Sequence, residues 1–517
     1  MKIVTASQMR ELDRRTQRER GISERTLIAR AGRATAEWIA AHYSKGTRIL
    51  ALVGKGNNGA DALVACRCLA KLGFPTRAFR AWRPGEARAF LIEAARPMRP
   101  GERPRIALDG LFGTGLDRPL EGRFLSLAAA LGEPALEVIS LDLPSGLHPD
   151  TGRPLGAAAR ARHTLAFGLP KFGLVQEHAA EHVGELHVLD LGFPADLVEK
   201  IPSAYELLAP EGLASFFAPR KRLSHKGDFG RVVVIGGSVG LAGAPALAAR
   251  AALRAGAGLV HLLVPKALSP GVLPLAGAEV MTTPLEDGGK GFFTERAFSK
   301  AREFLRTAQS VVLGPGLGRA AATQAFVEAI LGSCSVPLVL DADALNLFAR
   351  RTNRLRAPCG ERIFTPHPGE MGRLVGAAVA EVQRDRFGVA GAFARKHGVT
   401  VVLKGARTLV AHPRAVFVRA STAEGGGMRS VRFSVNAQAG NPGMATGGSG
   451  DVLSGILAAL LARGLSAADA ARAGVWLHAR AGDLALPPTG GGTAGDLIEV
   501  LPRAMERAVS STQLLSR

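Results

Sequence analysis

Residues 440–453, GNPGMATGGSGDVL, combine a run of glycines with one carboxylate at the start of an apolar helical pattern. The first amide N–H groups of a helix have no partner within the helix, and with the helix dipole they favour a phosphate or another developing anion. Asp451 lies in the first turn behind these amides. Because a carboxylate cannot itself bind the anion, we interpret Asp451 as a base that takes a proton from a nucleophile. The alternative is a helix cap in an ordinary loop.

Oxygen-bearing side chains also gather in the first half of the chain, after a strand predicted at 48–53. This strand leads into GKGNNGADAL, which fits the pattern G-x-G-x-x-G before a helix predicted over 61–72. The acidic residue that an NAD site needs about 20 residues later is missing. Asn57, Asn58 and Asp61 instead bring amide and carboxylate oxygens to the turn. The alternative is that the asparagines only form the turn and that Asp61 only charges the helix start.

Two further predicted strands end in the same way. One ends in Asp109 and precedes the glycine-rich loop 113–115, and the other ends at Asp142 and precedes a turn with Ser145. Because the carboxyl ends of parallel strands share one edge of a sheet, we expect a ligand site there. Asn58, Asp109 and Ser145 offer hard oxygen ligands, which suit an alkali or alkaline-earth ion and not zinc.

The second half repeats the alternation of strands, glycine-rich turns and helices. Asp341 and Asp343 follow one strand, His367 lies in a turn before a helix, and Lys404 follows a later strand. Asp341 and Asp343 are equally suited to capping the next helix or to binding a ligand, and His367 has a turn role as its alternative. In the first half, Lys171 follows a short strand, where its ammonium either meets a substrate phosphate or is solvated.

The composition indicates a globular enzyme of at least two domains. The 517 residues exceed the roughly 250–300 at which single cores stop growing. Hydrophobic residues make up 47% and charged residues 21%, which excludes a disordered chain. The net charge of +21 comes mostly from scattered arginines, so we expect anionic small ligands rather than a nucleic acid. We place the domain boundary at 215–225, where a short basic cluster resembles a linker.

The sequence favours a cytoplasmic protein without a membrane partner. No segment reaches the roughly 18–20 uncharged apolar residues of a membrane span, and the charged start of the chain contains no apolar signal segment. Cys66, Cys68, Cys334 and Cys359 show no metal-ligand spacing. We therefore expect free thiols in a reducing compartment.

Several motifs together resemble a known family. GNNGAD, LDGLFGTGL and DLPSGL resemble the N-terminal epimerase domain of the bifunctional NAD(P)H-hydrate repair enzymes. GSVGLAGA, GPGLG, LDADALN, TPHPGEM, LKGARTLV and GNPGMATGGSGDVLSG resemble the C-terminal dehydratase domain of that family, in the expected order. The resemblance implies an α/β protein with a Rossmann-like three-layer αβα domain over 1–218 and a ribokinase-like αβα domain over 219–517.

The family acts on NADH and NADPH damaged by addition of water to the nicotinamide ring. The resemblance therefore implies that the first domain interconverts the R and S hydrates, NADHX and NADPHX. It implies that the second domain uses ADP or ATP, with Mg²⁺, to expel water from the S form. It also implies a homo-oligomer and a potassium ion bound by Asn58, Asp109 and Ser145.

The family's contact residues carry over onto matching positions of this chain. In the first domain the implied hydrate contacts are Asn57, Asn58, Gly59, Ala60, Asp61, Gly113, Thr114, Gly115, Leu116, Asp117, Arg118, Pro119 and Asp142. In the second domain they are Ala244, Gly316, His367 and Asp451. The implied nucleotide contacts are Lys404, Gly405, Ala406, Arg407, Thr408 and Gly450.

The residues also suggest how each step proceeds. In the second domain, the amides of Gly447–Gly450 hold a transferring phosphoryl group while Asp451 takes the proton of the ring hydroxyl. In the first domain, Asp142 is the candidate acid–base group, and Asp61 competes for that role. One position departs from the family loop NNGGD, because Ala60 replaces its second glycine. If that position needs a positive φ, alanine costs about 1 kcal/mol and weakens the epimerase.

Two rival interpretations are kept. A ribokinase-class kinase for a vitamin precursor or sugar, fused to a nucleotide-binding module, shares Asp451 and the glycines, but the TPHPGEM turn and the epimerase-like half favour repair. In the second rival, the first half is a non-catalytic module that binds NADP or a partner. The intact set Asn58, Asp109, Asp142 and Ser145 argues against that rival.

Overall fold

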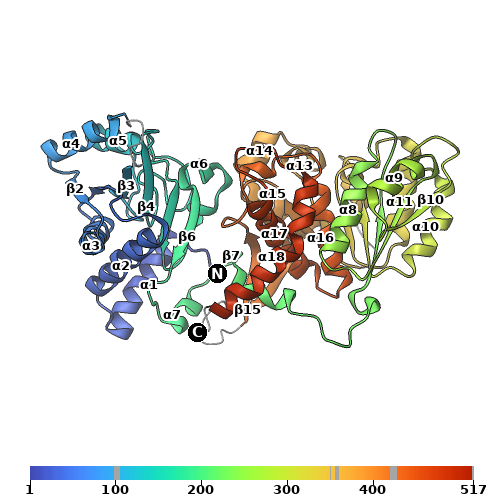
Figure 1. Ribbon diagram of the computed structural model, residues 1–517, viewed down its shortest axis with the longest axis horizontal. Helices are drawn as coiled ribbons and strands as arrows, with labels where there is room; N and C mark the ends of the chain where they lie inside the picture. Colours follow the sequence, from blue (N-terminus) through green and yellow to red (C-terminus); the bar gives the residue numbers. More distant parts are fainter. Residues whose placement is uncertain (98–104, 350, 356–359, 420–427, 515–517) are drawn as a thin grey trace. The chain divides into compact units, whose positions relative to one another are not determined.

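The computed structural model describes residues 1–97, 105–349, 351–355, 360–419 and 428–514 (Figure 1). The chain divides into two compact units, Met1–Leu207 and Leu208–Arg517. Each unit consists of a mainly parallel sheet with helices, so the predicted class, two α/β domains, is confirmed. The predicted division after residue 218 lies beyond the start of the second unit and stays a prediction.

The first unit has one parallel sheet of order β2-β1-β3-β4-β5-β6. The strands of this sheet are β1 (Ile49–Val53), β2 (Thr76–Arg80), β3 (Arg105–Gly110), β4 (Leu136–Leu141), β5 (His163–Phe167) and β6 (Glu185–Leu189). The unit also contains the short strand β7 (Tyr205–Leu207), which lies outside this sheet. Its helices are α1 (Ala6–Arg20), α2 (Glu24–His42), α3 (Asn57–Lys71), α4 (Pro84–Ala95), α5 (Gly122–Ala130), α6 (Ala180–Val183) and α7 (Ala195–Lys200).

Both faces of this sheet are buried, which explains why β1 is an unbroken apolar run. Ile49, Ala51 and Val53 face α2 and α3, whereas the alternate residues Leu50 and Leu52 face α4 and α5. Side chains of a strand alternate between its faces, so one five-residue strand anchors both helical layers. The carboxyl ends of the strands are thereby held in fixed positions around one edge.

The second unit has a sheet of order β10-β9-β8-β11-β12-β13-β14-β15-β16, which is parallel up to β14 and antiparallel from there. Its strands are β8 (Arg231–Ile235), β9 (Leu259–Pro265), β10 (Met281–Leu285), β11 (Ser310–Leu313), β12 (Leu338–Leu340), β13 (Arg362–Phe364), β14 (Thr400–Leu403), β15 (Leu409–Arg419) and β16 (Met428–Val435). Its helices are α8 (Gly243–Arg254), α9 (Ser269–Ala276), α10 (Phe298–Leu305), α11 (Ala321–Ser333), α12 (Asp343–Asn346), α13 (Pro368–Val375), α14 (Val379–Arg384), α15 (Arg386–His397), α16 (Ser449–Ala462), α17 (Ala467–Ala485) and α18 (Ala494–Leu514).

A large hydrophobic core of the second unit lies between one face of the sheet and helices α8, α9, α16, α17 and α18 (Figure 1). Ile363 of β13 belongs to this core. The next residue, Phe364, points to the opposite face and contacts Phe393 of α15, with ring centroids 6.2 Å apart. Helix α16 is buried along almost its whole length, so its N-terminus is fixed against the sheet.

Two smaller expectations can be compared with the fold. In the described part of the chain, no helix combines the length and the apolar character that a bilayer span needs. Cys66, Cys68 and Cys334 are free thiols, as expected, and Cys359 lies outside the described residues.

Candidate functional sites

The first candidate site is a cavity of about 740 Å³ at the carboxyl edge of the sheet in the first unit. Helices α1 and α2, the start of α3, the loop after β3 and the ends of β4 and β5 all contribute to its wall. Its lining includes the predicted residues Asn57, Asn58, Asp61, Gly113, Thr114, Gly115, Leu116 and Asp142. The predicted residues Asp117, Arg118 and Pro119 lie outside this lining, and Asp109 and Ser145 are buried behind it.

Helix α3 begins at Asn57, four residues earlier than the predicted start. This is possible because glycines let the backbone approach closely: a Cβ on Gly59 would lie 2.0 Å from the carbonyl oxygen of Gly54. Ala60 is therefore helical, and positive φ among described non-glycine residues occurs only at Asp142 and Ala342. A backbone cost at Ala60 is expected only if this position needs a positive φ; that condition is not met, and a right-handed helix accommodates alanine better than glycine.

Asn58, Asp109 and Ser145 are brought together, as predicted. The fully buried carboxylate of Asp109 accepts hydrogen bonds from Ser140 Oγ at 2.8 Å and from the backbone N–H of Ser145 at 2.9 Å. Asn58 Nδ2 donates to the carbonyl oxygen of Phe112 at 2.8 Å, and the same carbonyl accepts from Ser145 Oγ at 3.3 Å. The Oδ1 atom of Asn58 is buried and has no hydrogen-bond partner among the described residues.

Asp142 and Lys171 form a buried ion pair at the cavity wall. Asp142 follows β4 with φ at 63°, and its Oδ1 also accepts the backbone N–H of Phe167 at 3.1 Å. Lys171 is 1% exposed and donates to the carbonyl oxygen of Phe167 at 3.1 Å. The expectation of a solvated Lys171 is wrong, because its ammonium is held by groups of the protein. The pair holds the Asp142 carboxylate in one orientation at the cavity wall.

Two carboxyls whose pKa values are raised face the same cavity. Burial, with the negative charges of Asp142 and Asp13 as smaller causes, raises the pKa of Asp61 to about 8. Burial likewise raises the pKa of Asp13, on α1, to about 6. No donor in the described part of the chain bonds to Asp13. The sequence analysis missed Asp13, because a single acidic residue on a polar helix carries no signal of its role.

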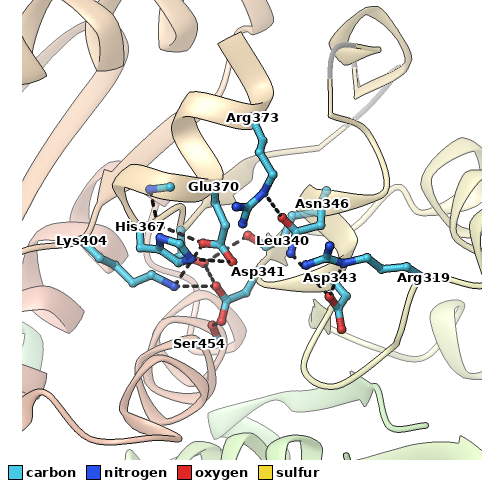
Figure 2. A network of polar contacts seen from close by, with 12 residues as sticks. Arg319, Leu340, Asp341, Asp343, Asn346, His367, Glu370, Arg373, Lys404 and Ser454 are labelled. Atoms are coloured by element: carbon cyan, nitrogen blue, oxygen red, sulfur yellow. Dashed lines mark hydrogen bonds and ion pairs between the residues drawn. The ribbon is translucent and has the colours of Figure 1, made fainter. Parts of the chain in front are cut away.

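The second candidate site lies at the carboxyl ends of β12, β13 and β14, which are adjacent in the second unit (Figure 2). Asp341 follows β12 and is its buried centre. Its Oδ1 accepts from Lys404 Nζ at 2.9 Å and from Thr365 Oγ1 at 2.7 Å, and its Oδ2 accepts from Ser454 Oγ at 2.8 Å. The side chain of Asp341 therefore does not cap a helix, which was one of its two expected roles.

His367 and Glu370 form the start of α13 in this network (Figure 2). Glu370 accepts the backbone N–H of His367 at 2.9 Å, and its other oxygen lies 3.5 Å from His367 Nε2. Lys404 Nζ lies 3.7 Å from Glu370. Burial disfavours the positive charge of the Lys404 ammonium, but the nearby carboxylates of Asp341 and Glu370 hold its pKa above the usual value. His367 is thus a helix cap whose imidazole also lies beside the charged cluster.

Asp343 orders the neighbouring loop (Figure 2). It accepts the backbone N–H of Gly318 at 3.0 Å and lies 3.4 Å from Arg319 Nε. Gly316, in the same loop, has φ at 62°, and a Cβ there would lie 3.4 Å from the Cβ of Ala244. The structure therefore brings the predicted residues Gly316 and Ala244 together.

The glycine-rich segment ends as predicted, at the N-terminus of α16. Gly448 caps the helix with φ at 88°, and Asp451 lies in the first turn. A Cβ on Gly450 would lie 3.4 Å from Lys404 Nζ and 4.0 Å from Asp341 Oδ2, so the helix start adjoins the ion pair. Burial, with Asp341 as the next cause, raises the pKa of Asp451 to about 8. The helix start thus combines free amides, a nearby ammonium and a proton-binding carboxyl.

The predicted nucleotide contacts divide into exposed and buried parts. Gly405 is exposed, and its carbonyl oxygen accepts Thr408 Oγ1 at 2.9 Å. The guanidinium of Arg407 is buried and donates to the carbonyl oxygen of Ala437, and burial lowers its pKa to about 10. Arg407 thus stabilises the turn after β14, and the nucleotide role of 404–408 stays a prediction.

Comparison with known proteins matches both units. A family model described as YjeF-related protein N-terminus matches residues 24–173, and one described as NAD(P)H-hydrate dehydratase matches 232–431 and 432–503. A protein of Moorella thermoacetica named bifunctional NAD(P)H-hydrate repair enzyme is 39% identical over 528 residues, covering 97% of this chain and 96% of that protein. Its namesake from Escherichia coli is 35% identical, covering 95% and 91%. The crystal structure of ADP/ATP-dependent NAD(P)H-hydrate dehydratase from Bacillus subtilis, co-crystallised with ATP and Mg²⁺, has a TM-score of 0.48 and 27% identity, covering 59% of this chain and 98% of that one.

Proposed function

The chain belongs to the family of bifunctional NAD(P)H-hydrate repair enzymes, and we propose that each unit carries out one of the two repair steps. The first unit interconverts the R and S hydrates of NADH and NADPH in its cavity. The second unit dehydrates the S hydrate with ADP or ATP at the start of α16. The observation that carries the second assignment is Asp451, a half-buried carboxyl in the first turn of α16 and beside the Lys404–Asp341 pair.

In the first unit, one acid and one base face the same substrate cavity. Asp61, with its pKa raised to about 8, is the proton donor at neutral pH. Asp142, paired with Lys171, is the proton acceptor. Two carboxyls that face one cavity, one of them with a raised pKa, can act together as acid and base. Proton transfer in both directions allows ring opening and reclosure, or loss and return of the hydroxyl, and either route exchanges the two epimers.

The residues predicted to bind potassium fit a monovalent cation. Asn58 Oδ1 is a buried acceptor without a donor in the described part of the chain, and the buried Asp109 carboxylate lies in the same cluster. Burial raises the pKa of Asp109 in the protein alone, and a bound cation would offset that penalty. We propose that Asn58, Asp109 and Ser145 hold K⁺, which supplies positive charge behind the cavity wall.

In the second unit, the ring hydroxyl of the S hydrate gives its proton to Asp451 as its oxygen attacks the terminal phosphorus of ADP or ATP, and the bond from that phosphorus to the bridging oxygen breaks to release AMP or ADP. The amides of Gly447–Gly450 stabilise the charge on the transferring phosphoryl group. The electron pair of the ring nitrogen then expels phosphate, a far better leaving group than hydroxide, by breaking the carbon–oxygen bond, and loss of a proton from the adjacent ring carbon restores the ring double bond. Lys404, held by Asp341, places a positive charge next to Gly450.

The donor set of this site also fits Mg²⁺, which binds one or two carboxylates together with phosphate oxygens. Asp343 would hold the ion together with the phosphate oxygens of the nucleotide, and the charge of the ion would offset that of the phosphates. The same proposal includes the remaining predicted contacts of the substrate and the nucleotide. It also includes a homo-oligomeric state and a cytoplasmic location.

The proposal is tested with purified protein, NADH hydrate and either ADP or ATP. We expect recovery of the reduced nicotinamide absorbance, with one phosphate released per NADH. A ribokinase-class kinase would instead accumulate a stable phosphorylated alcohol and restore no absorbance. Absence of recovery with both nucleotides contradicts the repair function.

A further inference from the structure

Two histidines and a glutamate meet at the amino end of β5 and β6, the edge of the first unit's sheet opposite the cavity. β5 begins with His163 and β6 begins with Glu185, and the two residues are paired in register. His187 pairs with Leu165 two residues further along. Residues in register, and residues two apart on one strand, share one face of a sheet. All three side chains therefore point to the same side, and their ligand atoms lie within 4.8 Å of one another.

The distances within this group, here called the His–Glu cluster, match a metal coordination shell. His163 Nδ1 lies 3.2 Å from His187 Nε2 and 3.5 Å from Glu185 Oε2, and His187 Nε2 lies 3.9 Å from Glu185 Oε2. A tetrahedral ion with ligands at about 2.0–2.1 Å separates neighbouring ligand atoms by about 3.3 Å. An ion therefore fits among the three atoms with shifts of a few tenths of an ångström.

The surroundings favour a cation. The cluster contacts the C-terminal turn of α2: the Trp38 ring lies 5.0 Å from the His163 ring and 4.8 Å from the His187 ring. His42 stacks on Trp38 at 4.0 Å. The C-terminus of a helix carries partial negative charge, and the Glu185 carboxylate adds a full one. Glu185 is exposed while His163 is buried, so an ion can enter from solvent and keep one coordination position for water.

Neighbouring charges leave the position open to an ion. Arg162 Nε lies 3.4 Å from Glu137 Oε1, and the Tyr43 hydroxyl donates to the same carboxylate. The arginine charge beside the cluster is thus already balanced. Two imidazoles and one carboxylate select zinc and similar transition metals over Mg²⁺ or Ca²⁺.

We propose that His163, Glu185 and His187 bind one divalent transition-metal ion, with zinc as the best match, at a site separate from the catalytic cavity. The ion ties β5 and β6 together beside the end of α2, which packs against β6 (Figure 1). The other half of α2 lines the cavity through Glu24, Leu27, Ile28 and Ala31. Metal binding therefore stabilises the first unit and steadies one wall of its cavity. This inference does not depend on the reaction proposed above.

The test is titration of the untagged full chain with Zn²⁺ by calorimetry and with Co²⁺ by absorption spectroscopy. We expect one strong site per chain, the intense visible bands of tetrahedral Co²⁺, and a higher melting temperature with metal. His163→Gln and His187→Gln should each weaken binding at least tenfold, and the double variant should lose both the bands and the thermal shift. His178→Gln is the matched control, because this histidine lies in the same unit and contacts the backbone oxygen of Thr151.

Glu185→Gln serves as a second variant, because this exposed side chain can be changed without disturbing the core. It should also weaken Co²⁺ binding, with the fold verified by circular dichroism. Equal affinity and stoichiometry in the wild type, the double variant and Glu185→Gln would overturn the proposal. The absence of any stoichiometric binding to the wild-type chain would overturn it as well.

Discussion

The two candidate sites are built from the same parts on unrelated segments of the chain. Each has a lysine–aspartate pair at the carboxyl edge of a parallel sheet, Lys171 with Asp142 and Lys404 with Asp341. Each also has a second aspartate near a helix start whose pKa burial raises to about 8. In each, the single described non-glycine residue with positive φ lies at or next to the paired aspartate. Backbone strain of this kind is held in place only by surrounding contacts and is concentrated at functional sites.

The difference lies in the two helix starts. Helix α16 begins after glycines, so its amides are open to a phosphoryl group. Helix α3 is also capped by a glycine, Gly56, but its first two residues are Asn57 and Asn58, whose side-chain amides donate to Glu24 and to the carbonyl oxygen of Phe112. We propose that the ion pair and the carboxyl of raised pKa serve proton transfer in both sites. The glycine-rich start of α16 then adds the ability to bind phosphate.

The largest expected effect separates the two sites by activity. Asp451→Asn keeps the shape of the side chain but removes the base, so dehydration of the S hydrate should fall by about 10²–10⁴-fold. Epimerisation should keep its wild-type rate. Recovery of NADH absorbance measures the first activity, and chromatographic separation of R and S hydrates measures the second. Loss of both activities would show that the two steps share one site.

The two ion pairs should differ in their contribution to stability. Lys171 is 1% exposed and Lys404 is 21% exposed. Lys171→Met leaves the Asp142 carboxylate with the backbone N–H of Phe167 as its donor and no partner of opposite charge, so the free energy of unfolding of the first unit should fall by about 3–5 kcal/mol. Lys404→Met should cost less, because Asp341 keeps two hydroxyl donors. Calorimetric unfolding of the full chain measures both, and a larger loss for Lys404→Met would contradict the comparison.

The two carboxyls of raised pKa should give opposite pH profiles. Asp451 acts without its proton, so kcat/KM for dehydration should rise about tenfold per pH unit and level off near pH 8. Asp61 acts as a proton donor, so kcat/KM for epimerisation should fall above about pH 8. Parallel profiles for the two activities would mean that one of the two aspartates has the wrong role.

A smaller effect is expected for Asp13. Its negative charge is one cause of the raised pKa of Asp61, so Asp13→Asn should move the alkaline limb of the epimerase profile to lower pH by a fraction of a unit. The dehydratase profile should not change. Glu11→Gln, on the same helix, is the matched control. An unchanged epimerase profile in Asp13→Asn would remove this residue from the site.

The smallest effect concerns Ala60. Because this residue is in a right-handed helix, Ala60→Gly should lower the free energy of unfolding by about 0.5–1 kcal/mol. It should not raise the epimerase rate. Chemical denaturation and the R–S exchange rate measure these quantities, and a faster variant would restore the idea that this position needs glycine.

The sequence predicted those parts of the fold and the sites that depend on local pattern. Buried strands such as β1 are continuous apolar runs, and glycines mark the turns that follow them. The position of Asp451 in the first turn of α16 follows from the same pattern. The presence of Asp142 in the cavity wall follows from its place after a strand, because parallel strands share a carboxyl edge.

Pairings across the sheet were outside the reach of the sequence. Lys404 and Asp341 are 63 residues apart, and their contact depends on the order β12-β13-β14. Lys171 had two expected roles, and only the fold shows that Asp142 holds it. Asp13 reaches the cavity because α1 packs over the sheet edge. None of these relations leaves a periodic signal in the chain.

The most direct test of the two-site account starts from the pure R hydrate of NADH with ADP or ATP. The wild-type chain should convert it fully to NADH, because the first unit supplies the S hydrate to the second. Asp142→Asn should repair added S hydrate at the wild-type rate but R hydrate only as fast as it epimerises spontaneously. If Asp142→Asn repairs the R hydrate as fast as the wild type, the assignment of epimerisation to the first cavity is contradicted.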